Sequence, residues 1–255
     1  MFNVIELTES FRQENVEFFN ALNEIRIGKV SDKTLDLIMK RHFEVDHNIN
    51  PNFIRLFFTN MEVDCYNSRK LMNIPSEGNW FHSKDVIKNS KTKPLFQIPI
   101  SINIKIGAVV MLVKNINVEG LCNGTIGVVT FIEIDVVWFN INGKEIKIEN
   151  VRENILDCTH SIIASRIGLP LQLGFSLTVH KAQGCTLNKA VLNFNSKIFM
   201  LSLPYVSLSR VKELNHLYII HNNKNELRKI LKNITIDKDV DFFYKNLGEK
   251  NFVTC

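Results

Sequence analysis

Apolar residues near the start of the chain recur at the spacing of one helix face. This spacing predicts a helix that Ser10 caps and Gly28 ends, and a second helix that begins at Ser31. The apolar run over residues 53–58 is rich in β-forming side chains and predicts a buried strand. A further helix is expected over residues 62–71. The first part of the chain is therefore predicted to mix helices and strands.

The pattern changes in the middle of the chain. Residues 72–104 contain three prolines and little periodicity, so we expect an irregular connection there. From Ile104 to about Val151, short apolar runs are punctuated by Asn-Gly pairs at 123–124 and 142–143. Asn-Gly is a strong hairpin signal, because both central residues of a type I′ turn need positive φ. These runs predict a small antiparallel β-barrel, for which a binding platform and a structural spacer are equally good interpretations.

Helical and strand patterns alternate again after Pro170. The patterns predict, in order, a helix over 171–183, a strand over 190–194, a helix over 204–211, a strand over 217–220 and a helix over 226–232. Such alternation is typical of a parallel sheet covered by helices. We therefore predict an α/β fold in which residues 1–104 and 165–255 form one discontinuous domain. Residues 105–164 are predicted to form the inserted small β-barrel domain.

Composition and charge narrow the class of protein. Of the 255 residues, 45% are hydrophobic, and 31 Lys and Arg against 26 Asp and Glu give a net charge of +5. This balance argues against disorder, and no uncharged apolar run reaches the ~18 residues of a membrane-spanning helix. The five cysteines are widely spaced without a C-x-x-C pair, so no disulfide framework and no metal site is predicted. We expect an intracellular protein in a reducing compartment, with no membrane partner.

Two short segments contain most of the residues that suggest chemistry. One is TVHKAQGCT over residues 178–186, and the other is YVSLSR over residues 205–210. Taken singly, a His or Lys near a helix end is more often a capping or surface group, and a lone Arg is a solvated charge. Together and in this order, the segments resemble the fifth and sixth motifs of the PIF-type DNA helicases of superfamily one, which are related to RecD-like helicases.

Further segments extend this resemblance over nearly the whole chain. ELTESFRQ over residues 6–13 resembles the fourth helicase motif, and residues 56–67 resemble the next element of the family. GAVVMLVKN over 107–115 and LCNGTIG over 121–127 resemble the family's inserted, Src-homology-like barrel. The resemblance implies the second RecA-like domain of an ATP-dependent motor that moves 5′ to 3′ on single-stranded DNA.

The resemblance also implies roles for individual residues on the nucleotide side. Arg12 and Arg210 would be arginine fingers, which neutralise charge on the γ-phosphate oxygens during phosphoryl transfer. Guanidinium suits this task because it stays charged and presents a planar fork of donors. Gln183 and Gly184 would lie along the same cleft near the nucleotide.

The implied DNA contacts are less sharply defined. Asn60, Thr178 and His180 can donate hydrogen bonds to phosphate oxygens, which hold a strand without reading its bases. Lys181 would add positive charge, although a helix-capping role fits it equally well. The aromatic cluster at residues 80–82 (Trp, Phe, His) is a weaker candidate for base stacking, because such clusters more often belong to a core.

Two sequence motifs of the complete motor are missing from these 255 residues. No G-x-x-x-x-G-K-[ST] string is present, and no apolar strand ends in Asp-Glu to help hold magnesium. ATP and Mg²⁺ would serve the complete motor, but we expect neither to bind tightly to this chain alone. A first RecA-like domain could act in trans. The alternative is a non-catalytic nucleic-acid-binding module or a decaying gene fragment, and Ser or Cys nucleophile chemistry has little support.

Overall fold

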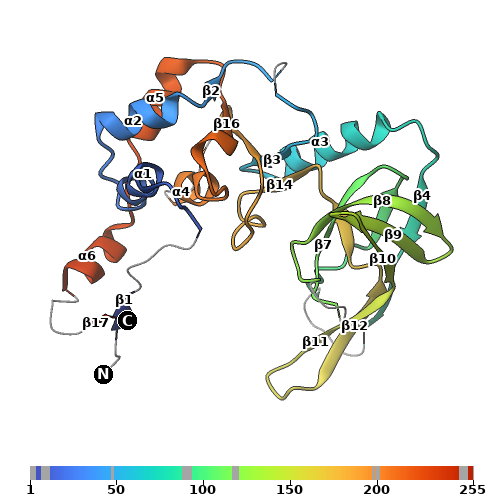
Figure 1. The fold of residues 1–255 in the computed structure, drawn as a ribbon. Coiled ribbons are helices and arrows are strands. Elements are labelled where there is room, and N and C mark those ends of the chain that lie inside the picture. Colours follow the sequence, from blue (N-terminus) through green and yellow to red (C-terminus); the bar gives the residue numbers. More distant parts are fainter. Residues whose placement is uncertain are drawn as a thin grey trace. The chain divides into compact units, whose positions relative to one another are not determined.

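The chain divides into two compact units, which are described separately. In a computed structural model, residues 4–6, 12–46, 49–87, 94–116, 121–196, 198, 202–246 and 252–254 are described. The first unit comprises Met1–Val63 with Leu177–Cys255, and the second comprises Asp64–Ser176. Figure 1 shows the elements of both units along the chain.

A five-stranded sheet organises the first unit. Its strands, in spatial order, are β14 (Ser176–Thr178), β3 (Ile54–Phe57), β15 (Ala190–Asn193), β16 (Leu217–Ile220) and β2 (His42–Phe43). Strand β15 runs parallel to β3 and β16, and β16 runs parallel to β2. The central strands are buried and rich in Val, Ile and Leu, as parallel strands covered on both faces require. The predicted parallel sheet and the α/β fold class are confirmed.

The helices of this unit occur among its strands along the chain. They are α1 (Val16–Arg26), α2 (Asp32–Met39), α4 (Leu203–Leu208), α5 (Lys224–Lys232) and α6 (Lys238–Asn246), with a 3₁₀ turn at Leu214–His216. Helix α3 (Asn60–Met72) begins in the first unit and continues into the second. A short parallel pair joins β1 (Val4–Glu6) to β17 (Phe252–Thr254).

The caps of the first two helices explain where those helices begin. The Asn15 side chain accepts a hydrogen bond from the Phe18 amide at 2.8 Å, and Ser31 accepts one from Thr34 at 3.2 Å. The predicted start at Ser31 is confirmed. The predicted cap at Ser10 is not the cap of α1, because Asn15 fills that position, and Ser10 itself lies outside the described residues.

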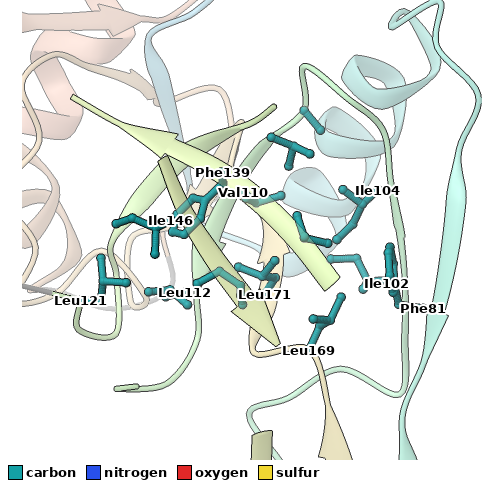
Figure 2. Close-up of a cluster of buried hydrophobic side chains, with 14 of the residues drawn as sticks. Phe81, Ile102, Ile104, Val110, Leu112, Leu121, Phe139, Ile146, Leu169 and Leu171 are labelled. Carbon is teal, nitrogen blue, oxygen red and sulfur yellow. The ribbon is translucent and has the colours of Figure 1, made fainter. Parts of the chain in front are cut away.

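Antiparallel strands build the second unit. One sheet has the order β10 (Lys144–Glu149), β9 (Val136–Ile141), β8 (Ile126–Glu133), β7 (Val109–Leu112) and β13 (Leu171–Leu173). A second sheet joins β11 (Val151–Leu156), β12 (Ile162–Gly168) and β5 (Lys84–Ile87), and a third pairs β4 (Asn79–His82) with β6 (Ser101–Ile104). Buried side chains from β4, β6, β7, β9, β10 and the 169–171 segment form one shared core (Figure 2).

The expectation of an irregular connection over residues 72–104 is wrong. Three strands, β4, β5 and β6, lie there. The sequence pattern does not predict them, because each pairs with a strand that is not adjacent to it in the sequence. Strand β5 pairs with β12, as in Asp85 opposite Arg166. These pairings place residues 64–104 and 165–176 in the second unit, whereas the sequence pattern assigned 1–104 and 165–255 to the α/β domain.

The two Asn-Gly pairs form turns of different kinds. Asn142 and Gly143 have φ of 51° and 88°, so the β9–β10 hairpin has the two positive φ values that a type I′ turn requires. Gly124 has φ of 91°, but Asn123 is not among the residues with positive φ. The amide of Thr125 donates to the Cys122 carbonyl at 3.0 Å. The 122–125 turn therefore has positive φ at its second central residue alone, as in a type II turn.

The predicted helix over residues 171–183 is also wrong. Residues 171–173 and 176–178 are strands, and Leu171 pairs with Leu112 across the antiparallel sheet. Between them, Gly174 lies so close to the neighbouring strand that an added Cβ would come within 3.1 Å of the Val110 carbonyl carbon. Pairing with distant strands outweighs the local helical spacing here. None of the helices in the described residues is long and apolar enough to cross a membrane.

Candidate functional site

The residues that suggested chemistry gather around one tight turn at the end of β14. We call residues 178–184 the 178–184 loop. Its turns are closed by main-chain hydrogen bonds from Ala182 to Thr178 at 3.0 Å and from Gln183 to His180 at 3.1 Å. The buried hydroxyl of Thr178 accepts from the Lys181 amide at 3.3 Å. Thr178 therefore shapes the loop, while His180, Lys181 and Gln183 are exposed.

The start of α3 lies beside this loop. The Val179 amide donates to the Phe57 carbonyl at 2.9 Å, which joins the loop to the last residue of β3. Two residues later, Thr59 caps α3: its hydroxyl donates to the Glu62 carboxylate at 2.6 Å and accepts from the Glu62 amide at 3.4 Å. Asn60, the first residue of the helix, is exposed. The structure thus brings Asn60 and the 178–184 loop to the ends of neighbouring strands.

Arg210 fastens the loop from the other side. Its Nη1 donates to the carbonyls of Ala182 at 3.3 Å and Cys185 at 3.4 Å. Its Nε donates to the Val206 carbonyl at 2.6 Å, and Nη2 donates to the Ser209 hydroxyl at 2.7 Å. Only 6% of Arg210 is exposed. A guanidinium is suited to this position because its fork of donors can reach several carbonyls at once.

Arg12 lies next to Arg210. Arg12 Nη1 donates to the Ser209 carbonyl at 3.3 Å, and the neighbouring Gln13 amide donates to the Val211 carbonyl at 3.2 Å. Burial lowers the pKa of Arg210, and the positive charge of Arg12 lowers this pKa further. A guanidinium remains charged at neutral pH despite such a shift. Two like charges are therefore held together at this place, an arrangement that a bound anion would stabilise.

Gly184 ends the loop in a conformation that favours glycine. Its φ is 87°, and no heavy atom lies within 4 Å of the position that a Cβ would occupy. The requirement for glycine is therefore one of backbone conformation and not of packing. An open, exposed backbone at Gln183 and Gly184 leaves space for a ligand to approach.

Sequence reasoning named several residues of this arrangement and did not identify some of the contacts that hold them in place. It singled out Arg12 and Arg210, but not the anchoring amide of Gln13, although Gln13 follows Arg12 in the same motif. It also did not assign a capping role to Thr59, whose spacing from Glu62 is the capping-box signature.

The donors at this site suit phosphate better than a metal ion. Arg12 and Arg210 supply positive charge, which fits the phosphates of a nucleotide. Among the residues that the structure describes, no group of three or more His, Cys, Asp or Glu side chains could hold a metal ion.

Comparison with known proteins shows which sequences this chain resembles. Residues 99–132 match the family described as DNA helicase Pif1, 2B domain. The chain is 31% identical to the human ATP-dependent DNA helicase PIF1 over 85% of its own length and 34% of that protein. It is 28% identical to the Bdellovibrio bacteriovorus Pif1 over 96% of its own length and 54% of that protein. This chain is a relative of the Pif1-type DNA helicases.

Solved Pif1 structures show the same fold. The unliganded Pif1 from Bacteroides sp matches 98% of this chain with a TM-score of 0.79 and 26% identity, over 58% of its own chain. The Candida albicans Pif1 matches 94% of this chain with a TM-score of 0.74 and 29% identity, over 60% of its own chain. The predicted RecA-like architecture is confirmed. The chain spans about a third to six tenths of the length of these relatives.

Proposed function

We propose that this chain is the second RecA-like half, with its inserted 2B-type domain, of an ATP-dependent DNA helicase that moves 5′ to 3′. The carrying observation is that the 178–184 loop joins two sets of residues within one turn. Gln183 and Gly184 follow Ala182, whose carbonyl accepts a hydrogen bond from Arg210. His180 and Lys181 follow Val179, whose amide donates to the Phe57 carbonyl three residues before Asn60. A single rigid loop with nucleotide-facing and strand-facing residues can couple the two ligands mechanically.

The nucleotide side of the proposal rests on charge. Arg12 and Arg210 would stabilise the γ-phosphate oxygens, which carry the negative charge of the transition state. Arg12 is the more exposed of the two, while Arg210 already donates to four oxygens of its own unit. We therefore assign the direct phosphate contact to Arg12, and to Arg210 the placement of the loop and of the positive field. The Bacteroides sp Pif1 in complex with ADP-AlF4 matches 97% of this chain with a TM-score of 0.75, which supports a nucleotide as a ligand of the complete motor.

The strand side rests on exposed donors at the ends of two strands. Asn60, His180 and Lys181 can donate to phosphate oxygens, and buried Thr178 fixes the turn that presents the last two. Contacts of this kind hold a strand in any sequence, as a translocating motor requires. The Bacteroides Pif1 bound to ssDNA matches 98% of this chain with a TM-score of 0.71. Single-stranded DNA is accordingly the proposed partner.

The missing phosphate loop gives the first experiment. We expect the purified 255-residue chain to show no significant ATP hydrolysis with single-stranded DNA, because these residues contain no G-x-x-x-x-G-K-[ST] string. A first RecA-like domain added in trans should restore DNA-stimulated hydrolysis, and Arg12→Ala should abolish the restored activity. Turnover by the isolated chain that Arg12→Ala removes would overturn the first expectation. No gain on mixing would count against assembly in trans.

A non-catalytic nucleic-acid-binding module is the second candidate. The observation that favours it is the full engagement of Arg210 with carbonyls of its own unit, because a purely structural arginine would look the same. The two candidates differ in one measurement. A module binds single strands with an affinity that Arg12→Ala leaves unchanged and that no nucleotide alters. A motor half couples the two ligands, so that ATP analogues shift strand affinity once the first domain is present.

A further inference from the structure

Strand β4 presents an unusual pair of aromatic rings to solvent. Trp80 is 62% exposed, and its ring lies 6.2 Å from that of His82 with an angle of 13° between the planes. Tryptophan carries the largest apolar side chain, so leaving most of it in water costs hydrophobic free energy. Neither residue belongs to the 178–184 loop or to its supports.

The pleat of the strand explains how this face is built. Alternate side chains of a strand point to opposite faces, so Trp80 and His82 share one face and Phe81 points to the other. Phe81 is only 9% exposed and belongs to the core of the second unit together with Ile102 of β6 (Figure 2). The burial of Phe81 and Ile102 therefore fixes the orientation of the β4–β6 ribbon. The ring pair is held outward by the core beneath it.

The strand opposite the rings is polar on the same face. Asn103 pairs with Trp80, and Ser101 pairs with His82. The Asn103 amide packs over Gly78, where an added Cβ would come within 2.4 Å of its Oδ1. On this ribbon face, the exposed apolar surface is consequently confined to two near-parallel rings. Such a surface suits a flat heteroaromatic ligand better than an apolar protein face, which requires a broader patch.

We propose that Trp80 and His82 form a stacking site for the bases of single-stranded nucleic acid. The proposal deepens the proposed function and rests on it, because it supplies base contacts to a chain whose other predicted contacts reach phosphates. Aromatic rings bind bases of any sequence, since every base has a π-face. The second unit thereby becomes a binding platform and not a spacer.

Two measurements test this site: quenching of tryptophan fluorescence by a single strand, and binding of a strand that lacks bases. The chain has only two tryptophans, Trp80 and Trp138, so quenching that Trp80→Phe abolishes must arise at Trp80. We expect a short oligothymidylate to quench wild-type fluorescence, and Trp80→Ala to weaken binding by about fivefold or more. Trp80→Phe should bind nearly as tightly as the wild type, because phenylalanine still stacks. A strand of equal length with abasic sugars should bind the wild type and Trp80→Ala equally.

The outcomes separate this site from the proposed function. Equal weakening of the normal and abasic strands by Trp80→Ala would overturn the stacking site and point to a structural role. If the wild type binds no strand at all, the proposed function fails, and titration with free thymidine and adenosine monophosphates then decides the stacking site alone. Absence of Trp80 quenching at saturating mononucleotide would overturn it. His82→Ala should reproduce a smaller part of the Trp80→Ala effect.

Discussion

The Nη1 atom of Arg210 lies 3.3 Å from the Ala182 carbonyl, so the arginine of one motif directly holds the turn of another. The connection continues along the main chain, because the Leu187 amide donates to the Arg210 carbonyl at 2.8 Å. Two segments about 25 residues apart therefore behave as one structural element. Any role of Arg210 in catalysis is superimposed on this role in folding.

Replacing Arg210 should first of all destabilise the 178–184 loop, because Arg210 donates a hydrogen bond to the Ala182 carbonyl of that loop. Arg210→Ala removes donors from the carbonyls of Val206, Ala182 and Cys185, and we expect a loss of about 3 kcal/mol of stability in the first unit. Hydrogen exchange at the Ala182 and Leu187 amides would report this loss locally, and urea unfolding would report it globally.

Arg12→Ala is the matched control for Arg210→Ala. Arg12 is partly exposed and makes one long hydrogen bond to Ser209, so its loss should cost no more than about 1 kcal/mol. Arg210→Lys keeps the charge but not the fork, and its stability should fall between the wild type and Arg210→Ala. If Arg12→Ala and Arg210→Ala lose the same free energy of unfolding, the anchoring role of Arg210 is contradicted.

The sequence predicted the elements whose signals are local. Strand β16 and the Asn142-Gly143 hairpin are predicted correctly because their signals, an apolar run and a turn-forming residue pair, each lie within a few neighbouring residues. Strands β4 and β5 were missed because their stability comes from distant partners such as Ile102 and Arg166. The helix predicted over 171–183 is present only as short-range turns at its end, because Gly184 and the hydrogen bond from Val179 to Phe57 stop the segment from forming a continuous helix.

The sequence motifs name the residues of the candidate site but do not predict the contacts that these residues make. The motifs named Arg12, Arg210 and the loop residues, yet no pattern shows that Arg210 is 6% exposed and bonded to main-chain carbonyls. Carbonyl acceptors are present at every residue, so a sequence carries no signal for which of them a long side chain will reach.

Gly184 offers a test of loop conformation without any change in side-chain chemistry. An alanine at φ of 87° is strained, and open space around the Cβ position means that no clash adds to this strain. We expect Gly184→Ala to cost about 1–2 kcal/mol of stability and to weaken binding to single-stranded DNA. Fluorescence anisotropy with labelled oligothymidylate would measure the binding.

Gly143→Ala controls for the strain itself. Gly143 has φ of 88° and the same open surroundings, but it lies in the β9–β10 hairpin of the second unit. Its alanine variant should lose similar stability and keep its DNA affinity. If both variants lose affinity equally, the effect comes from general destabilisation and the loop has no special role.

Acid should weaken the second unit through one ion pair. Asp85 accepts from Arg166 Nε at 2.6 Å and Nη2 at 2.7 Å, and this hydrogen bonding lowers the pKa of Asp85 below its ordinary value of 3.8. A carboxyl whose folded pKa is depressed stabilises the fold above its unfolded pKa, and loses that contribution as pH falls through its folded pKa. Stability should therefore decline below about pH 4.

Asp85→Asn isolates this contribution. The variant should be less stable at neutral pH by about 1 kcal/mol, since the Asp85 side chain is 34% exposed and screened by solvent, and its stability should fall less steeply below pH 4. Asp135→Asn is the control, because Asp135 adopts φ of 61° and asparagine tolerates that conformation. Urea unfolding at several pH values measures both. An unchanged acid slope in Asp85→Asn would exclude the ion pair as the cause.

Salt dependence can identify the phosphate contacts of the loop. If Lys181 lies against a phosphate, Lys181→Gln should weaken binding to single strands of every sequence. The plot of log affinity against log salt concentration should also become shallower by about 0.7, the value for one released counterion on a single strand. Lys229→Gln provides the comparison, because Lys229 is exposed on α5, a helix that packs against α2. Lys229→Gln should leave the slope of log affinity against log salt concentration unchanged. The same slope in wild type and Lys181→Gln would show that the lysine caps the turn without meeting DNA, and would leave Asn60 and His180 as the strand contacts to be tested.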